Sequence, residues 1–191
     1  MPKTIQKLMF SLLLLTILNT NVQATLSLLS LLSNIAKERK ETIAYTQTRT
    51  FSFSQQPLIS YGNFYFIPPH YLEQRVLRPR KQRLLIKDDM LYIISPKKAI
   101  HAVKLANYPK LLLLTMTLRA LLMNQHNFLQ HYYKTTIHGN KKHWRLRLSP
   151  RNKKLIRNIT VYGKLAKINT IFIDYLSNDT LTLNLHYNKS K

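Results

Sequence analysis

The sequence predicts an α+β domain, in which an incomplete antiparallel β-barrel of roughly ten to eleven strands is covered by an N-terminal helix and an apolar helical insert. Three observations predict it: an early apolar stripe at helical spacing, many short alternating segments separated by turn residues, and one long apolar run in mid-chain. So many strands exceed what a twisted open sheet usually holds without curling. A sheet curled around the apolar insert would enclose a cavity for a small apolar ligand.

The first 24 residues have the order of a secretory signal peptide. Lys3 and Lys7 precede an apolar run over residues 8–18, and Val22-Gln23-Ala24 has small residues where a signal peptidase reads. The run is shorter than the roughly 20 residues that a membrane-spanning helix needs. We therefore expect cleavage after Ala24, export to the periplasm, and a single domain over residues 25–191.

The first half of the expected domain is a helix followed by a meander. Leucines and Ile35 form a wide apolar stripe over residues 26–39, which indicates a helix lying on the protein. From Thr42 to Phe53 the period changes to two, with large residues on one face. Shorter strands follow, separated by prolines and by an aspartate turn. They are expected over residues 61–67, 72–77, 83–87 and 91–94.

The middle of the chain is an apolar helix, and the last third returns to strands. After Pro109, residues 111–123 are apolar almost all round, so this helix should be buried or should cover an apolar space. It is too short to span a membrane. The strands of the second meander are expected over residues 131–138, 144–148, 155–162, 168–175 and 181–187.

The composition argues against most catalytic sites. The chain has no cysteine, which excludes disulfides, thiolate metal sites and a cysteine nucleophile. Its three glycines form none of the common phosphate-binding loops. Its seven histidines are scattered, and its seven acidic residues are too few to suggest a catalytic pair. We expect no enzyme, no cofactor and no metal site, with a secreted enzyme as a weakly supported alternative.

Several motifs occur in a characteristic order along the chain. They are Tyr45-Thr46-Gln47, the strand at 61–66 with the two prolines after it, the strand, aspartate turn and strand at 84–93, and the segments 108–122 and 144–150. In this order the chain resembles the periplasmic lipoprotein carriers of the LolA type, and especially their LolA-related branch. The resemblance implies a half-barrel closed by helices, acyl chains of a lipoprotein, glycolipid or other lipid as cargo, and no catalysis. It also implies an inner-membrane release complex and an outer-membrane receptor as partners.

The sequence departs from this family where the latch of the helical lid is expected. The well-known carriers have an arginine just before the proline that follows the second strand, and it is thought to latch the helical lid. Here that place is occupied by Pro68, and a family aromatic is replaced by Gln74. Without a guanidinium the usual latch cannot form. Arg49 and Arg119 are the candidate lid contacts in its place, and each could equally be a surface arginine whose stem covers apolar groups.

The candidate lipid-binding residues come from the strand faces and from the insert. Alternation alone leaves open which strand residues line a cavity and which fill ordinary core. The strand candidates are Phe51, Phe53, Phe64, Phe66, Leu72, Leu84, Ile86, Leu91, Ile93, Leu146 and Leu148. The insert needs partners on both sides, and methionine adapts to mobile acyl chains. The helix candidates are Leu112, Leu113, Met116, Leu118, Leu121 and Met123.

The charge supports a competing interpretation. The formal net charge is +23, and removal of Lys3 and Lys7 with the signal peptide would leave +21. Basic residues gather over 75–83, 141–147 and 151–157, with aromatic residues between them. In a carrier, which we expect to be a monomer, these clusters would touch anionic membrane surfaces transiently. The alternative is a secreted basic protein that binds polyanions such as nucleic acid or lipopolysaccharide.

The signal peptide leads to the first prediction. After expression in a bacterium with its native N-terminus, the protein recovered from the periplasm should begin at Thr25, as measured by N-terminal sequencing or intact mass. Replacing Ala24 by a bulky charged residue should leave the precursor uncleaved. A full-length protein that starts at Met1 and stays in the cytoplasm would contradict the export signal.

Overall fold

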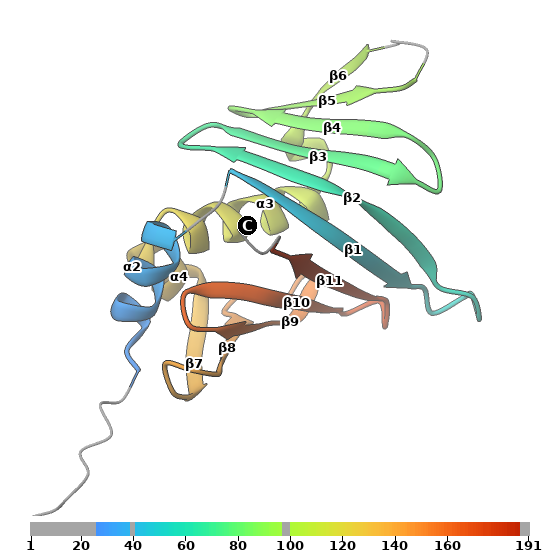
Figure 1. Ribbon diagram of the computed structural model, residues 1–191. Coiled ribbons are helices and arrows are strands. Elements are labelled where there is room, and N and C mark those ends of the chain that lie inside the picture. The colour runs from blue at the N-terminus through green and yellow to red at the C-terminus, as the bar shows by residue number, and fades with distance from the viewer. Residues whose placement is uncertain (1–25, 39–40, 97–99, 188–191) are drawn as a thin grey trace, which may run out of the picture.

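A computed structural model describes residues 26–38, 41–96 and 100–187, so the expected signal peptide lies outside the described residues. Within these ranges the chain forms one antiparallel sheet of eleven strands in the order β6-β5-β4-β3-β2-β1-β11-β10-β9-β8-β7. The sheet is open, because β6 and β7 stand at its two edges. Three α-helices and a short 3-10 helix accompany it (Figure 1). The predicted fold class is confirmed.

The elements alternate in two meanders around a helical segment. The first six strands are β1 Thr42–Thr50, β2 Leu58–Ile67, β3 Tyr71–Arg78, β4 Gln82–Lys87, β5 Met90–Ile94 and β6 Ile100–Lys104. The helices are α2 Leu28–Glu38, η1 Leu105–Asn107, α3 Pro109–Leu122 and α4 His126–Tyr132. The last five strands are β7 Tyr133–Gly139, β8 Trp144–Pro150, β9 Ile156–Lys164, β10 Lys167–Tyr175 and β11 Thr180–His186.

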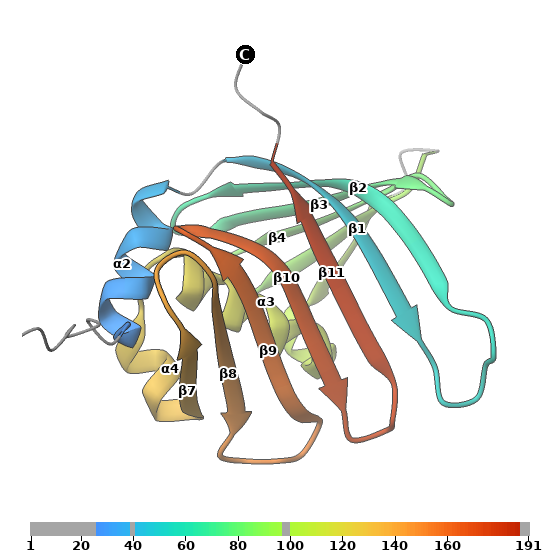
Figure 2. The same ribbon diagram turned by 60° about the horizontal axis from the view of Figure 1, so that its bottom comes forward.

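The two meanders join through the strands that come first and last in the chain, β1 and β11. Strand β1 pairs with β11 in a register that sets Thr46 opposite Asn184, so chain segments about 140 residues apart form the middle of the sheet. The sheet curves around α3, which lies between its two halves, while α2 and α4 lie at one end (Figures 1 and 2). The concave face and the helices therefore enclose the interior.

Three details differ from the sequence prediction. Strand β1 ends at Thr50, because Ser52 donates its backbone N–H to the carboxylate of Asp179 at 3.1 Å and the chain turns there. Strand β6 is short and mostly exposed, so its five residues show no clear inward face, and its position comes from its pairing with β5. Helix α4 takes only seven residues, and its His131 was expected at the start of a strand that instead begins at Tyr133. Short elements such as these carry too little periodicity to be recognised.

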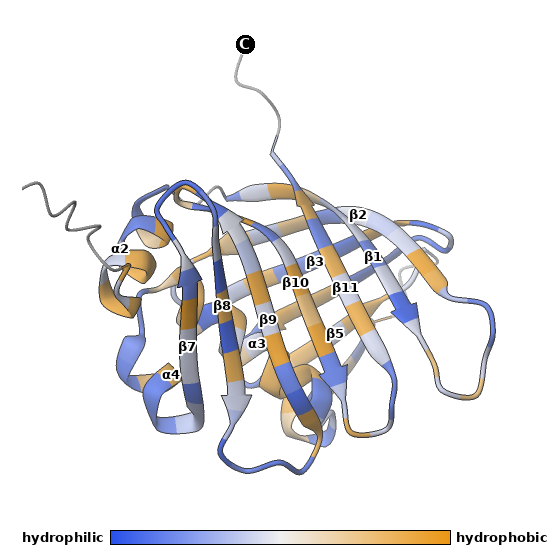
Figure 3. Ribbon diagram, turned by 90° about the horizontal axis from the view of Figure 1, so that it is seen from below, coloured by the Kyte–Doolittle hydropathy of each residue, from blue (hydrophilic) through white to orange (hydrophobic). Residues whose placement is uncertain are grey.

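Alternation along the strands separates a buried concave face from a polar convex face. In β8, for example, Trp144, Leu146 and Leu148 are buried while Arg145 and Arg147 are exposed. The same exchange of apolar and polar residues runs along the strands of this half (Figure 3). Close packing holds the β8 side, since a Cβ on Gly163 would lie 2.0 Å from the Trp144 ring. The β7–β11 half therefore forms a filled core.

The convex face of β3 and β4 carries a buried carboxylate. Glu73 is only 1% exposed and accepts hydrogen bonds from Arg83 at 2.8 and 3.0 Å, from Arg75 at 3.0 Å, and from the Tyr71 hydroxyl. The hydrogen bonds from Arg83 are the main cause that lowers the pKa of Glu73 to about 2, against the effect of burial. One carboxylate thus pairs with two arginines of the first basic cluster and neutralises one of their two charges, and its bonds to Arg83 join β3 to β4.

This network leads to the second prediction. Replacing Glu73 by Gln should lower the free energy of unfolding by about 2 kcal/mol at neutral pH, because two guanidinium groups lose their charged acceptor. Since the pKa is lowered on folding, the carboxylate stabilises the fold above its unfolded pKa of about 4.5, and this stabilisation is lost as the pH falls towards about 2. The difference between wild type and Glu73→Gln should therefore shrink on acidification.

Urea unfolding monitored by the fluorescence of Trp144 measures both stabilities at each pH. The control is Asp89→Asn, at an exposed carboxylate that forms no ion pair with the described residues, and it should change little. A stability difference for Glu73→Gln that stays constant from neutral pH to about pH 3 would contradict the assigned role of the carboxylate.

Candidate functional site

Three adjoining cavities lie between the concave face of the sheet and α3. The outer cavity has a volume of about 540 Å³, and the middle and inner cavities are narrow, with about 30 and 40 Å³. From the outer to the inner end, each cavity shares lining residues with the next one. The outer and middle cavities share Gln47, Gln74, Leu84, Leu111, Leu114 and Leu181. The middle and inner cavities share Phe64, Leu72, Leu118 and Leu183.

One face of α3 forms the wall opposite the sheet along this path. Leu111, Leu114, Thr115, Leu118 and Leu122 line the cavities in this order from the outer to the inner end. Their spacing of three and four residues places them on a single helix face. At a rise of about 1.5 Å per residue, the path from the first to the last is on the order of 16 Å long. This length is on the scale of a long acyl chain.

The structure brings most of the strand candidates to the concave face. Phe64, Phe66 and Leu72 line the inner cavity, and Leu84 and Ile86 line the middle one. Two further candidates lie on the same face, since Leu91 pairs with Ile86 and Ile93 with Leu84.

Four strand candidates lie away from the three cavities. Leu146 and Leu148 are fully buried in the β7–β11 half, opposite Val161 and Ile159, and do not reach the three cavities. Phe51 and Phe53 stack on each other in the turn after β1, with ring centroids 5.2 Å apart. The side chain of Phe53 is 85% exposed there, because the strand that would have turned it inward has already ended.

The helix candidates are mostly on the other faces of α3. Of the six, Leu118 lines the cavities, and five do not: Leu112, Leu113, Met116, Leu121 and Met123. A helix that is apolar all round offers no pattern that tells its faces apart. Leu111, Leu114, Thr115 and Leu122 were missed for this reason. Thr117 could have indicated which face of α3 packs on the core. Its hydroxyl is buried and bonds to that of Tyr133 on β7 at 2.6 Å, away from the cavity wall.

A polar group lies on the sheet at the boundary between the outer and middle cavities. The side-chain amide of Gln74 on β3 donates to the hydroxyl of Tyr45 at 2.9 Å and to Gln47 Oε1 at 3.3 Å, both on β1. The intervening strand β2 has Gly62 opposite Tyr45, and a Cβ there would lie 2.0 Å from the carbonyl oxygen of Arg75. The missing side chain lets residues of β1 and β3 meet across β2. Burial raises the pKa of Tyr45, so its hydroxyl stays protonated.

Arg119 connects α3 to the ends of the strands. Its guanidinium donates to the backbone carbonyl of His70 at 2.7 Å and makes a longer contact of 3.5 Å with that of Asp88. These carbonyls belong to the turns between β2 and β3 and between β4 and β5. Burial lowers the pKa of this arginine, against the effect of Asp88. A guanidinium therefore connects the helix to the sheet in this protein, and the arginine that carries it belongs to α3 and not to a strand.

Arg49, the other candidate lid contact, points into the outer cavity. It lines that cavity together with Lys110 and Tyr175, and its guanidinium carbon lies 4.8 Å from the centre of the Phe51 ring. It makes no hydrogen bond or ion pair with α3 among the described residues. Its Nε is buried without a hydrogen-bond partner.

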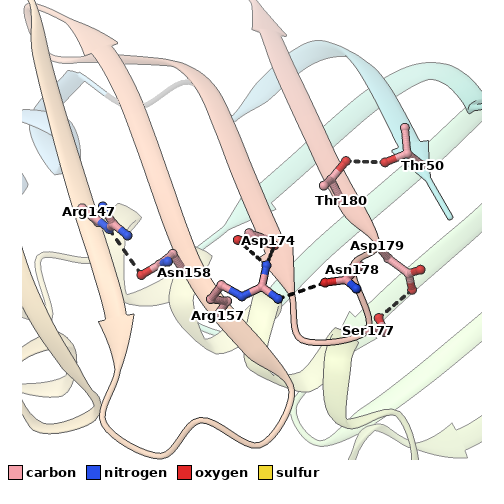
Figure 4. A network of polar contacts seen from close by, with 9 residues as sticks. All are labelled: Thr50, Arg147, Arg157, Asn158, Asp174, Ser177, Asn178, Asp179 and Thr180. Atoms are coloured by element: carbon pink, nitrogen blue, oxygen red, sulfur yellow. Dashed lines mark hydrogen bonds and ion pairs between the residues drawn. The ribbon is translucent and has the colours of Figure 1, made fainter. Parts of the chain in front are cut away.

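The remaining basic clusters lie on the convex side and in the loops. Arg157 binds Asp174 at 2.9 Å and Asn178 at 3.0 Å, and Arg147 donates to Asn158 at 3.3 Å (Figure 4). The exposed basic residues around β8 form a strip, the β8 basic strip. It comprises Lys141, Lys142, Arg145 and Arg147.

The described part of the chain has neither a cluster of metal-binding side chains nor a helix that could span a membrane. Across residues 26–38, 41–96 and 100–187, no three His, Asp or Glu side chains gather in a way that could hold a metal ion. In the same ranges, every helix is too short or too polar to cross a membrane.

Comparisons with known proteins add the family. The model of the family described as outer membrane lipoprotein carrier protein LolA-like matches residues 21–182. No curated protein matches the sequence significantly. Similar solved structures include a LolA superfamily protein from Nitrosomonas europaea, with 8% identity, a TM-score of 0.45, and coverage of 87% of this chain and 94% of that one. LprF from Mycobacterium bovis has 11% identity, a TM-score of 0.37, and coverage of 83% and 91%.

A chain of the MucA/MucB complex of Pseudomonas aeruginosa is also similar, with 11% identity and a TM-score of 0.42. The alignment covers 86% of this chain and only 59% of that one. The family model, in contrast, spans nearly the whole described domain and includes the strands and the helix that form the cavities. The chain belongs to the family of LolA-like outer membrane lipoprotein carrier proteins.

Proposed function

We propose that this protein is a periplasmic carrier that binds acyl chains of lipoproteins, or of a related lipid or glycolipid, and transfers them between the inner and the outer membrane. The observation that carries the proposal is the connected apolar path between the sheet and α3 in a member of the LolA-like family. Each methylene that leaves water for such a path contributes about 0.8 kcal/mol. Chain length would thus set the affinity without covalent chemistry.

The contacts of α3 suggest how cargo enters. The middle and inner cavities are narrow, so an acyl chain needs the helix to move away from β2–β4. Among the described residues, Arg119 holds α3 to that half by donating to backbone carbonyls at its two turns. On the opposite side the bond between Thr117 and Tyr133 fixes the helix to β7. We propose that α3 opens on the Arg119 side.

The same proposal covers the compartment and the partners. Export through the signal peptide would place a monomeric, non-catalytic domain of residues 25–191 in the periplasm. There it would receive cargo from an inner-membrane release complex and deliver it to an outer-membrane receptor. The family and the expected signal peptide support this route.

The cavity wall provides the third prediction. Leu114→Asp places a charge where the outer and middle cavities meet, so it should weaken binding of a fluorescent fatty-acyl probe at least tenfold. Met116→Asp is the matched control, because Met116 lies on the same helix, is also half-buried, and lines none of the three cavities. It should leave probe affinity within about twofold of wild type.

Circular dichroism and thermal unfolding establish that both variants are folded. A second substitution, Leu84→Trp, fills the outer and middle cavities from the sheet side and should also reduce binding. Equal affinity in wild type and in folded Leu114→Asp and Leu84→Trp would rule out this path as the acyl site.

The β8 basic strip provides the fourth prediction, which separates carriage from polyanion binding. Changing its four residues to Gln should slow transfer of the acyl probe to anionic vesicles and flatten the salt dependence, because exposed charges steer the approach to the membrane. Acyl affinity in the absence of vesicles should stay the same, since different residues line the cavities. Tight, salt-sensitive binding to DNA or lipopolysaccharide that these changes abolish, without measurable acyl binding, would instead favour the polyanion binder.

A further inference from the structure

The outer cavity has a polar end that an acyl chain alone does not explain. Its walls combine apolar residues of α3, β4 and β11 with Arg49, Gln47, Lys110 and Tyr175. The inner cavity, by contrast, has no cationic side chain in its walls, which are apolar except for Glu38, Glu41 and Tyr187. The path thus changes from polar to apolar as it runs inward along α3, which is the profile of an amphiphile rather than of a hydrocarbon.

The cation at this end is not neutralised by the protein. Arg49 forms no ion pair among the described residues, and its buried Nε has no hydrogen-bond partner. Such a donor is costly to bury unless something accepts its hydrogen bond. The guanidinium carbon of Arg49 lies 4.8 Å from the centre of the Phe51 ring. Because Arg49 lines the outer cavity and its side chain makes no hydrogen bond with the described residues, the terminal nitrogens of its guanidinium are available to a ligand there.

The carboxylate of this region is already occupied. Asp179 accepts a hydrogen bond from the Ser177 hydroxyl at 2.9 Å, which Figure 4 shows. It also accepts one from the backbone N–H of Ser52 at 3.1 Å, and it pairs with Lys110 at 3.5 Å. These bonds lower its pKa, the one from Ser52 most. The polar end thus keeps an excess of positive charge, because one carboxylate stands against two cations, Arg49 and Lys110. The ammonium of Lys110 also lies over the Tyr175 ring at 4.9 Å.

We propose that the outer cavity binds the anionic head group of a single-tailed amphiphile, a carboxylate or a phosphate, with Arg49 as its main partner and Lys110 as the second cation. The acyl tail runs from there along Leu114 and Leu118 towards the inner cavity. The inference rests on the proposed carrier function and narrows its cargo. A guanidinium binds both head groups through two parallel N–H donors, and a neutral ester or alcohol cannot replace the charge.

The experiment compares ligands that share one tail. Laurate, dodecyl phosphate and the neutral 1-dodecanol displace a fluorescent acyl probe from the purified protein near neutral pH. We expect wild type to bind at least one of the two anions about tenfold more tightly than the alcohol, as charge-assisted hydrogen bonds predict. The tighter of the two anions identifies the head group.

Variants connect this preference to one side chain. Arg49→Gln should lose most of the preference for the anions and keep only the part that Lys110 supplies, while its affinity for the alcohol stays unchanged. Arg49→Lys keeps the charge but not the paired donors, so it should retain part of the preference and also show that the site tolerates substitution. Arg145→Gln, at an exposed arginine of the β8 basic strip, is the control and should keep the full preference.

The three possible contrary outcomes decide three separate questions. Equal affinity of wild type for the anions and the alcohol would overturn the head-group site while leaving acyl carriage intact. A preference that persists undiminished in folded Arg49→Gln would overturn the role of this arginine. Failure of wild type to bind any of the three ligands or the probe would overturn the carrier function itself.

Discussion

The width of the sheet is the constraint on which the rest of this structure depends. Eleven strands about 4.8 Å apart form a surface on the order of 48 Å wide, whereas one helix with its side chains is about 10 to 12 Å across. Curling brings the two halves of the apolar concave face towards each other, and α3 fills the middle (Figure 2). One helix cannot cover both halves equally well. The space left against β1–β4 and the neighbouring strands β11 and β10 is the path of adjoining cavities.

The two halves of the sheet therefore have different tasks. On the β7–β11 side, Trp144 packs on Gly163 and Leu146 is fully buried, so this half supplies the stable core. The Thr117 hydroxyl bonds to Tyr133 and attaches α3 to that core. On the other side the helix faces cavities, and Arg119 reaches the backbone of two turns. This difference between the two edges of α3 is the basis for the proposed opening on the Arg119 side.

Polar groups in the path act by their position between apolar surfaces. Gln74 replaces a family aromatic, and it bonds to Tyr45 and Gln47 across a strand that has Gly62 at the crossing. This group satisfies its own donors and separates the apolar interior from the outer cavity. Arg49 lies beyond it without a partner in the described chain. The difference between a satisfied and an unsatisfied polar group, in one cavity wall, is what makes a charged head group a sharper hypothesis than a bare acyl chain.

The sequence by itself determined most of the strands, their inward faces and the family. Period-two alternation reports which side chains share a face, so Phe64, Phe66 and Leu72 were found before their neighbours were known. It could not separate cavity lining from core, because Leu146 shows the same alternation and differs only in what covers it. Nor could it orient α3, which is apolar on every side, and so Leu114 was missed. The tertiary structure decided these points, since a cavity is defined by the distance between two surfaces, and that distance depends on how the whole sheet curls around its helix.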